Sequence, residues 1–198
     1  TVLNEPTRFK GKYVVIAPHA SAHAKYWNNP GGWQKVIDYL NEKGYEVVMI
    51  TSEKLNDKWH DSKLGGTLTG VTNKTGDHID LKDRMVDIKH ADAFIGLGSG
   101  LSWMSWAIGT PTVLISGFSK PYSEFEGCER IFTPKESTCN GCFNREWLNA
   151  GDWEWCPDHK DTDRHFECSK TITVEQVING LNKALFNDGV KNTVGKPF

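Results

Sequence analysis

Short apolar runs recur along the chain between longer polar segments. Most of these runs are rich in β-branched residues and are bounded by polar or turn-forming residues, which is typical of a buried strand. We expect such strands at residues 12–17, 45–50, 93–96 and 112–115, and a last one at Ile131 and Phe132. Residues 51–80 are polar, and we expect one helix and one short strand there without assigning their bounds.

Between these runs, apolar residues recur every three or four positions, as on one face of an amphipathic helix. We expect helices at residues 33–43, 81–90, 101–108 and 174–186. Gly44 and Gly109 follow two of them and indicate helix ends. Strand, helix and strand in this order form a βαβ unit, whose strands are parallel. The pattern therefore predicts an α/β fold, a doubly wound parallel sheet of five or six strands.

Length and composition limit the number of units and the classes of partner. A chain of 198 residues suits one domain, or one domain with an inserted or appended module. We expect an α/β domain over residues 1–135, a cysteine-rich module over 136–170, and a helix and tail over 171–198 that pack on the domain. A net charge of −2 gives no basic surface for nucleic acid, and no apolar run is long enough to span a bilayer.

Four of the five cysteines lie close together between positions 139 and 168, and no apolar leader is visible at the N-terminus. Closely spaced cysteines without a secretory signal favour metal binding in a reducing compartment. We therefore expect a cytoplasmic protein.

Two loops at strand ends carry the candidate chemistry. Residues 18–27 leave the first strand with small residues and then place Lys25 near the sheet edge. Residues 96–102 run from a strand directly into a helix through three glycines, so that backbone N–H groups and the helix N-terminus face a ligand. Glycine-rich loops are common, and a lone lysine is often a solvated surface residue. Only the two loops together, in one α/β domain, indicate an anionic ligand such as a pyrophosphate.

Two longer segments resemble a known family. Residues 21–30, SAHAKYWNNP, and residues 94–106, FIGLGSGLSWMSW, resemble signature segments of the bacterial autotransporter heptosyltransferases. Those enzymes are related to the lipopolysaccharide heptosyltransferases and have the GT-B architecture of two Rossmann-like domains. The resemblance extends from about residue 12 to residue 177 and implies that this chain is the C-terminal, donor-binding half.

In the wider heptosyltransferase group, the second loop usually carries an acidic residue, a threonine and then Gly-Leu-Ser-His. The matching positions here are Gly98, Ser99, Gly100, Leu101, Ser102 and Trp103. Gly98 and Trp103 thus stand where the group has the acidic residue and the histidine, and any sugar or ribose contact of those two side chains is lost. A backbone anion site is retained.

The resemblance implies transfer of a heptose from an ADP-linked donor to Ser or Thr hydroxyls of an autotransporter protein. Lys25 would hold the diphosphate, the end of the second strand would lie near the nucleoside, and residues 116–119 would approach the sugar. The candidate donor-binding residues are Ser21, Lys25, Ser52, Ser99, Gly100, Leu101, Ser102 and Phe118. In this group the general base is an acidic residue of the N-terminal domain, so no catalytic base is assigned here, and Glu53 and Asp92 are interpreted as solvated or structural.

The cysteine-rich module presents a CxxC pair and two further cysteines, a set that suits tetrahedral zinc or iron. The four candidate ligands are Cys139, Cys142, Cys156 and Cys168. Two disulfides or a redox CxxC are the alternatives from residue type alone. His159 and His165 are possible substitute ligands but are interpreted as surface residues, and the fifth cysteine, Cys128, as a small buried one. The aromatic residues expected around the module are Trp147, Trp153, Trp155 and Phe166.

The family resemblance implies that the metal is iron and that the module contributes to assembly into a large ring, a homo-oligomer. Three other functions stay open: transfer of another sugar or to a glycan acceptor, a non-catalytic scaffold built on the metal knuckle, and a small redox protein.

Overall fold

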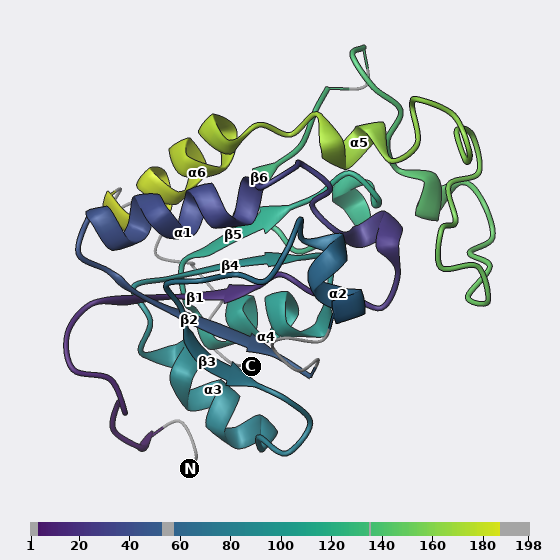
Figure 1. Ribbon diagram of the computed structural model, residues 1–198. Coiled ribbons are helices and arrows are strands. Elements are labelled where there is room, and N and C mark those ends of the chain that lie inside the picture. The colour runs from purple at the N-terminus through teal and green to yellow at the C-terminus, as the bar shows by residue number, and fades with distance from the viewer. Residues whose placement is uncertain (1–3, 53–57, 135, 187–198) are drawn as a thin grey trace.

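A computed structural model describes residues 4–52, 58–134 and 136–186. Within these ranges the fold is a six-stranded, all-parallel sheet with the strand order β3-β2-β1-β4-β5-β6 (Figure 1). The strands are β1 (Tyr13–Ala17), β2 (Glu46–Thr51), β3 (Thr72–Thr75), β4 (Ala93–Leu97), β5 (Thr112–Ile115) and β6 (Glu129–Ile131). The order reverses between β1 and β4, so the loops that follow these two strands open on the same crevice.

The four central strands are those that the hydrophobic pattern predicts. Every residue of β1, β4 and β5 is buried, as expected for strands covered on both faces. The last strand differs from its prediction. It begins at Glu129 and ends at Ile131, and Phe132 lies beyond it with 43% of its surface exposed. As an edge strand, β6 buries a single apolar residue, which gives a weak sequence signal.

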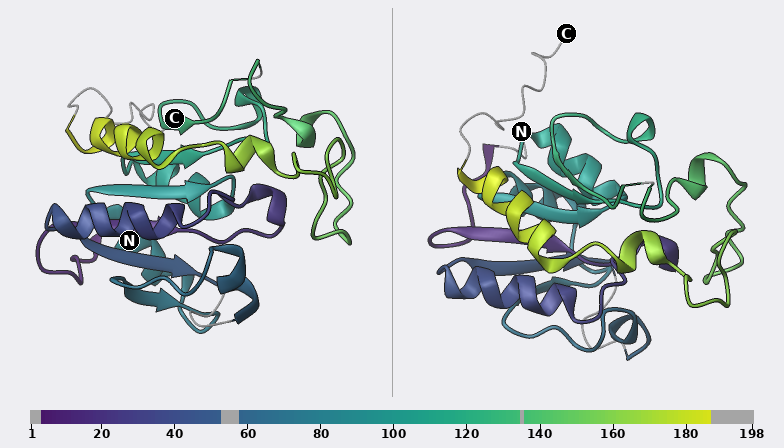
Figure 2. Two further views of the ribbon diagram at one scale, coloured as in Figure 1. Left: turned by 45° about the horizontal axis from the view of Figure 1, so that its top comes forward. Right: turned by 90° about the horizontal axis from the view of Figure 1, so that it is seen from above.

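Helices cover both faces of the sheet. Figure 2 shows α1 (Gly32–Glu42) and α6 (Val174–Phe186) side by side on one face. The opposite face is covered by α3 (Leu81–Lys89) and α4 (Gly100–Ile108), which contact each other. These four helices confirm the sequence prediction within one residue at most ends, and residues 51–80 contribute α2 (Lys58–Lys63) and β3.

Each helix layer seals its own core. The α1 and α6 side buries Trp33, Leu40 and Leu181, and the α3 and α4 side buries Ile88 against Phe94 of β4. Gly109 ends α4 in the left-handed conformation at φ 89°, where a side chain would be strained.

The segment 136–170, called here the cysteine segment, lies beyond the carboxyl ends of the strands (Figure 1). Its regular structure is limited to a 3-10 turn, η4 (Cys142–Asn144), and a short helix, α5 (Glu167–Lys170). It is attached to the loop after β5 by two backbone hydrogen bonds, from Gly141 N–H to the Gly117 carbonyl and from Phe143 N–H to the Phe118 carbonyl. The division into a domain, a module and a packing helix stays a prediction, and its tail beyond residue 186 lies outside the described residues.

In the described parts of the chain, no helix combines the length and the apolar character that crossing a bilayer requires.

Candidate functional site

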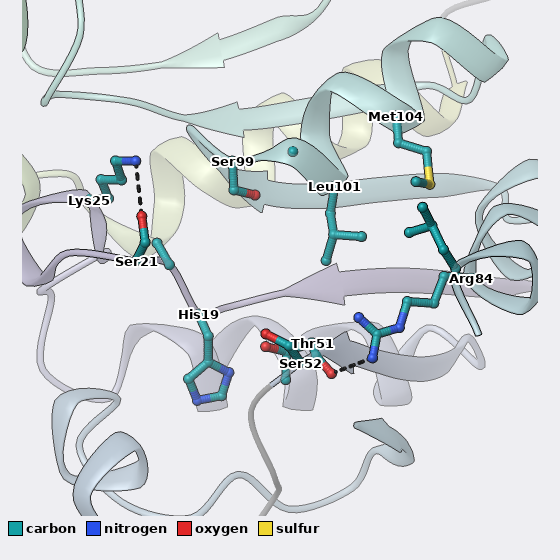
Figure 3. Close-up of a pocket in the computed structure, with 12 residues that line it drawn as sticks. His19, Ser21, Lys25, Thr51, Ser52, Arg84, Ser99, Leu101 and Met104 are labelled. Atoms are coloured by element: carbon teal, nitrogen blue, oxygen red, sulfur yellow. Dashed lines mark hydrogen bonds between the residues drawn. The ribbon is translucent and has the colours of Figure 1, made fainter. Parts of the chain in front are cut away.

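A cavity of about 590 Å³ opens at the carboxyl edge of the sheet, next to the switch between β1 and β4. Its walls come from the loop after β1, the end of β2, the first turn of α4 and α3 (Figure 3). The lining residues are His19, Ala20, Ser21, Lys25, Thr51, Ser52, Leu81, Arg84, Ser99, Gly100, Leu101 and Met104. Six of the eight predicted donor-binding residues thus lie around one cavity, because parallel strands bring their carboxyl ends to one edge.

Lys25 is the cation of the β1 loop and ends the 3-10 turn η2 (His23–Lys25). Its ammonium donates a hydrogen bond to the Ser21 hydroxyl at 3.3 Å, and both side chains line the cavity (Figure 3). Burial lowers the pKa of Lys25. Since no ion pair to Lys25 occurs among the residues described, the site carries a partly desolvated positive charge, which favours an anionic ligand.

The N-terminus of α4 faces the same cavity. Ser99 is the N-cap residue, but its side chain makes no capping hydrogen bond, and its buried Oγ has no partner within the described ranges. A Cβ added at Gly100 would meet no atom within 4 Å, so the backbone is open to close approach. The first amides of a helix lack intrahelical acceptors and carry a partial positive charge. Together with Lys25 they form a site suited to phosphate groups.

Ser102 is placed differently from its prediction. Its side chain is fully buried, its hydroxyl donates to the Leu97 carbonyl at 2.5 Å, and its amide donates to the Ser99 carbonyl at 3.1 Å. Both donors are therefore used within the β4–α4 loop, and Ser102 fixes the loop shape without lining the cavity. The sequence pattern places the Ser102 hydroxyl in this loop, but the direction in which it points is set by the first turn of α4.

Phe118 also lies outside the large cavity. Its ring is buried and contacts the rings of Phe143 and Trp155 in the cysteine segment. It lines a smaller cavity together with Lys25, at the boundary between the donor site and the cysteine segment.

Arg84 is a cavity residue that sequence reasoning missed. Its guanidinium is buried and donates from Nη2 to the carbonyls of Thr51 at 2.9 Å and Gly76 at 2.6 Å, while Nε has no partner in the described structure. It ties the ends of β2 and β3 together beside the predicted nucleoside region. A signal was present, because Arg84 precedes the buried Ile88 by one helical turn and so interrupts an apolar face.

Of the two acidic residues interpreted as solvated or structural, Asp92 is exposed, and its carboxylate accepts a hydrogen bond from the Tyr13 amide at 2.8 Å, which anchors the start of β1. Glu53 lies outside the described residues.

The four predicted ligand cysteines line one small cavity of about 10 Å³, which has room for one ion. Three of them are buried and Cys139 is half-buried, and none of the five cysteines forms a disulfide. Cys139 and Cys142 lie within reach of one cation together with the Asp158 carboxylate. The cavity wall also includes the rings of Trp155 and Phe166.

The thiols shift one another's pKa values in opposite directions. A hydrogen bond with Cys168 lowers the pKa of Cys139. Burial, followed by the neighbouring Cys139, raises the pKa of Cys142 to about 12, and contact with Cys139 together with burial raises the pKa of Cys168 well above its usual value. Several thiolates at this spacing require a cation to compensate their charge. Soft sulfur donors around an ion-sized space therefore fit zinc or iron, and the donor set favours neither.

Charged side chains surround the cysteines. Arg145 donates to both carboxylate oxygens of Asp158 at 2.5 Å, and Arg164 to both oxygens of Glu167 at 2.7 Å. Glu167 in turn accepts from the Cys139 amide at 2.8 Å. These pairs hold the backbone around the cysteines in place.

Three further residues depart from the sequence interpretation of the module. His159 is half-buried and lies within metal-binding reach of Cys139 and Glu167, and His165 is half-buried with its ring nitrogen on the Glu154 carbonyl. Neither is a simple surface residue. Trp147, by contrast, is 93% exposed and does not pack in the cluster. Cys128 is half-buried away from the other four, and burial raises its pKa to about 11.

A polar bridge joins the cysteine segment to the β1 loop. The Glu154 carboxylate contacts His23 Nδ1 at 2.9 Å and the Lys63 ammonium at 3.2 Å, and the His23 ring packs on Phe166. Burial lowers the pKa of His23. The loop that carries Lys25 is thus fixed from the side of the cysteine segment.

Comparison with known proteins agrees with this geometry. The family model "Glycosyltransferase family 9 (heptosyltransferase)" matches residues 3–125. The autotransporter heptosyltransferase BAHTCr of Citrobacter rodentium is 41% identical over 98% of this chain and 47% of its own length. The autotransporter heptosyltransferase TibC of Escherichia coli is also 41% identical, over 98% of this chain and 48% of its own. The chain thus spans about half the length of these relatives.

A crystal structure of dodecameric, iron-containing TibC in complex with ADP-D-β-D-heptose superposes with a TM-score of 0.82 at 40% identity, over 92% of this chain and 47% of that one. The fold is therefore GT-B-like. A relative from Burkholderia thailandensis described as the inactive autotransporter heptosyltransferase BimC is 34% identical over 84% of this chain and 38% of its own length. From its sequence and its fold, the chain belongs to glycosyltransferase family 9, the heptosyltransferases, and it is similar to autotransporter heptosyltransferases.

Proposed function

We propose that this chain is the donor-binding part of a glycosyltransferase that transfers a heptose from ADP-heptose to Ser or Thr hydroxyls of an autotransporter protein. The observation that carries the proposal is the cavity in which Lys25 and the N-terminus of α4 face the same space. TibC, a relative that spans this chain almost completely, has been crystallised with ADP-D-β-D-heptose. The donor-binding residues are Ser21, Lys25, Ser52, Ser99, Gly100 and Leu101.

Chemically, the site acts on the leaving group. Breaking the bond between the anomeric carbon and the diphosphate oxygen transfers negative charge to the departing ADP. Lys25 and the α4 amides, fixed before the reaction, stabilise that charge as it develops. In this proposal Thr51, Ser52 and Arg84, which line the large cavity, contact the nucleoside, and residues 116–119, which line the smaller cavity beside it, approach the sugar. The acidic general base is expected in the other half of the GT-B architecture.

We further propose that Cys139, Cys142, Cys156 and Cys168 hold one iron ion, with zinc as the alternative. The support is the ion-sized cavity that these four residues line, and the iron in the related TibC crystal structure. Four sulfur ligands leave no open coordination position, so the ion acts structurally and fixes the segment behind Phe118. By analogy with dodecameric TibC, the protein assembles as a homo-oligomer. Five thiols without a disulfide suit the cytoplasm.

A second candidate function is a non-catalytic scaffold that retains the fold and the metal module. It is favoured by one observation, the relationship to the protein described as inactive. The two functions differ in whether the large cavity binds nucleotide.

Calorimetric titration of the purified protein with ADP, ADP-heptose, UDP and ADP-glucose tests the proposal. We expect saturable binding of ADP and ADP-heptose and weaker binding of the UDP and glucose ligands. Metal analysis of the same sample gives the identity and amount of the ion. Absence of binding by every nucleotide would favour the scaffold function.

A further inference from the structure

Beside the large cavity lies a small one of about 10 Å³, enough for a single hydroxyl-sized group. The loops after β1, β4 and β5 form its walls, and Lys25 lines both cavities. The small cavity also contains a carboxylate, that of Glu124, which the proposed donor site does not use.

The carboxylate of Glu124 is held in one orientation. Its side chain is 6% exposed. Arg130 Nε donates to Oε2 at 2.5 Å, and the Ser116 hydroxyl donates to Oε1 at 2.7 Å. Arg130 also donates to the Ser116 hydroxyl at 3.0 Å and to the Ser119 carbonyl at 2.9 Å. The network connects β6 to the loop after β5, so the position of the carboxylate is set before any ligand arrives.

One side of this carboxylate is uncovered because residue 98 is a glycine. A Cβ built at Gly98 would lie 3.9 Å from Glu124 Oε1, and that oxygen is the nearest atom it would meet. A carboxylate oxygen accepts more than one hydrogen bond, and among the described residues Oε1 has one donor, Ser116. A second donor can therefore approach from the Gly98 side.

We propose that Glu124 is a sugar-binding residue, whose Oε1 accepts a hydrogen bond from a hydroxyl of the transferred sugar. The inference rests on the proposed function, because a diphosphate held at Lys25 directs the attached sugar toward the cavity that Lys25 shares with Glu124. A fixed, desolvated acceptor distinguishes a sugar that presents a hydroxyl there from one that lacks it, since the latter leaves the carboxylate under-solvated.

The competing role of Glu124 is purely structural, as the partner of Arg130. A structural role affects binding of ADP and of ADP-heptose equally, because both depend on the same loops. A sugar contact affects ADP-heptose alone. The comparison of these two ligands therefore separates the roles.

The experiment measures the dissociation constants of ADP and ADP-heptose by calorimetry for the wild-type protein and three variants. Glu124→Gln keeps the shape and removes the charge. Gly98→Ala adds a methyl group over Oε1 without a backbone clash. Glu126→Gln, an exposed neighbour on the same loop, is the matched control.

We expect Glu124→Gln and Gly98→Ala to raise the dissociation constant of ADP-heptose about tenfold, the loss typical of one hydrogen bond to a charged group. The dissociation constant of ADP should change less than about twofold. Glu126→Gln should bind both ligands as the wild type does. If both test variants bind ADP and ADP-heptose equally more weakly, or bind both as the wild type does, Glu124 has a structural role only. If Glu124→Gln does not fold, Gly98→Ala decides alone. If the wild-type protein binds ADP-heptose no more tightly than ADP, this inference is overturned. If it binds neither ligand, the proposed function is overturned.

Discussion

The ammonium nitrogen of Lys25 lies 5.7 Å from the centroid of the Phe118 ring. The same ring contacts Phe143 and Trp155, with centroids 5.1 and 5.8 Å away. The lysine proposed to hold the diphosphate therefore lies against the aromatic cluster that surrounds the cysteines. Donor site and cysteine segment share a wall, so disturbing one is expected to affect the other.

Replacing Lys25 with alanine should weaken ADP binding about tenfold to a hundredfold, because one charged hydrogen bond to phosphate is lost in a partly desolvated site. The measurement is calorimetric titration with ADP, and Lys35→Ala on the exposed face of α1 is the matched control. Equal ADP affinity in the Lys25 variant, the control and the wild type would exclude Lys25 as a phosphate ligand.

Replacing Gly117 with alanine should destabilise the junction between the β5 loop and the cysteine segment. The new Cβ would lie 2.7 Å from the Cys168 carbonyl oxygen, which belongs to the backbone and cannot rotate away. We expect a loss of about 2 kcal/mol, as for other overpacked sites, and weaker metal retention.

Thermal unfolding and metal analysis measure the effect of Gly117→Ala. Gly100→Ala serves as the structural control, because a Cβ there meets no atom within 4 Å and the melting temperature should not fall. An unchanged melting temperature for Gly117→Ala would contradict the packing of Cys168 against the β5 loop.

Single substitutions of the cysteines should distinguish those that bind the metal from the one that does not. Cys142→Ser and Cys156→Ser should reduce the metal content from about one ion per chain to nearly none, since a structural site needs its full set of thiolates. Cys128→Ser should keep the ion, because Cys128 lies apart from the cavity that the other four line. Elemental analysis of the purified variants gives the stoichiometry. Loss of metal in the Cys128 variant, or retention in the other two, would refute the ligand assignment.

Asp87 on α3 should make the stability of the protein depend on pH. Its side chain is 1% exposed, neither carboxylate oxygen has a hydrogen-bond partner within the described ranges, and burial raises its pKa. The folded state therefore binds the proton more tightly than the unfolded state does. The contribution of Asp87 is fully present below the unfolded pKa of about 3.9 and is lost as the pH rises through the folded pKa.

Asp87→Asn should accordingly stabilise the protein by about 1 kcal/mol at pH 7 and have little effect near pH 3.5. Denaturant unfolding at the two pH values measures the difference. Asp83→Asn on the same helix is the control with the opposite sign, because Arg8 hydrogen-bonds the exposed Asp83 carboxylate and lowers its pKa. Destabilisation by Asp87→Asn at pH 7 would show that the buried carboxylate has a favourable partner.

The sequence by itself determined the order of the main strands and helices along the chain, because continuous apolar runs and helical spacing leave few other ways to bury the same residues. It also determined that two strand-end loops meet at one edge, since parallel strands require it. Its limits lie at the sheet edges. The last strand was misplaced because β6 buries only Ile131, and β3 could not be located because its sequence, TNKT, is polar.

Tertiary structure decided which way the side chains point and which distant residues meet. Ser102 lies in the predicted loop, yet the first turn of α4 directs its hydroxyl to Leu97. Arg84 and Glu124 reach their cavities from α3 and from the loop after β5, elements that carry no binding motif. Position along the chain does not fix where these side chains point or which residues they meet. The direction of a side chain depends on helix phase, and the approach of separate loops depends on how the layers pack.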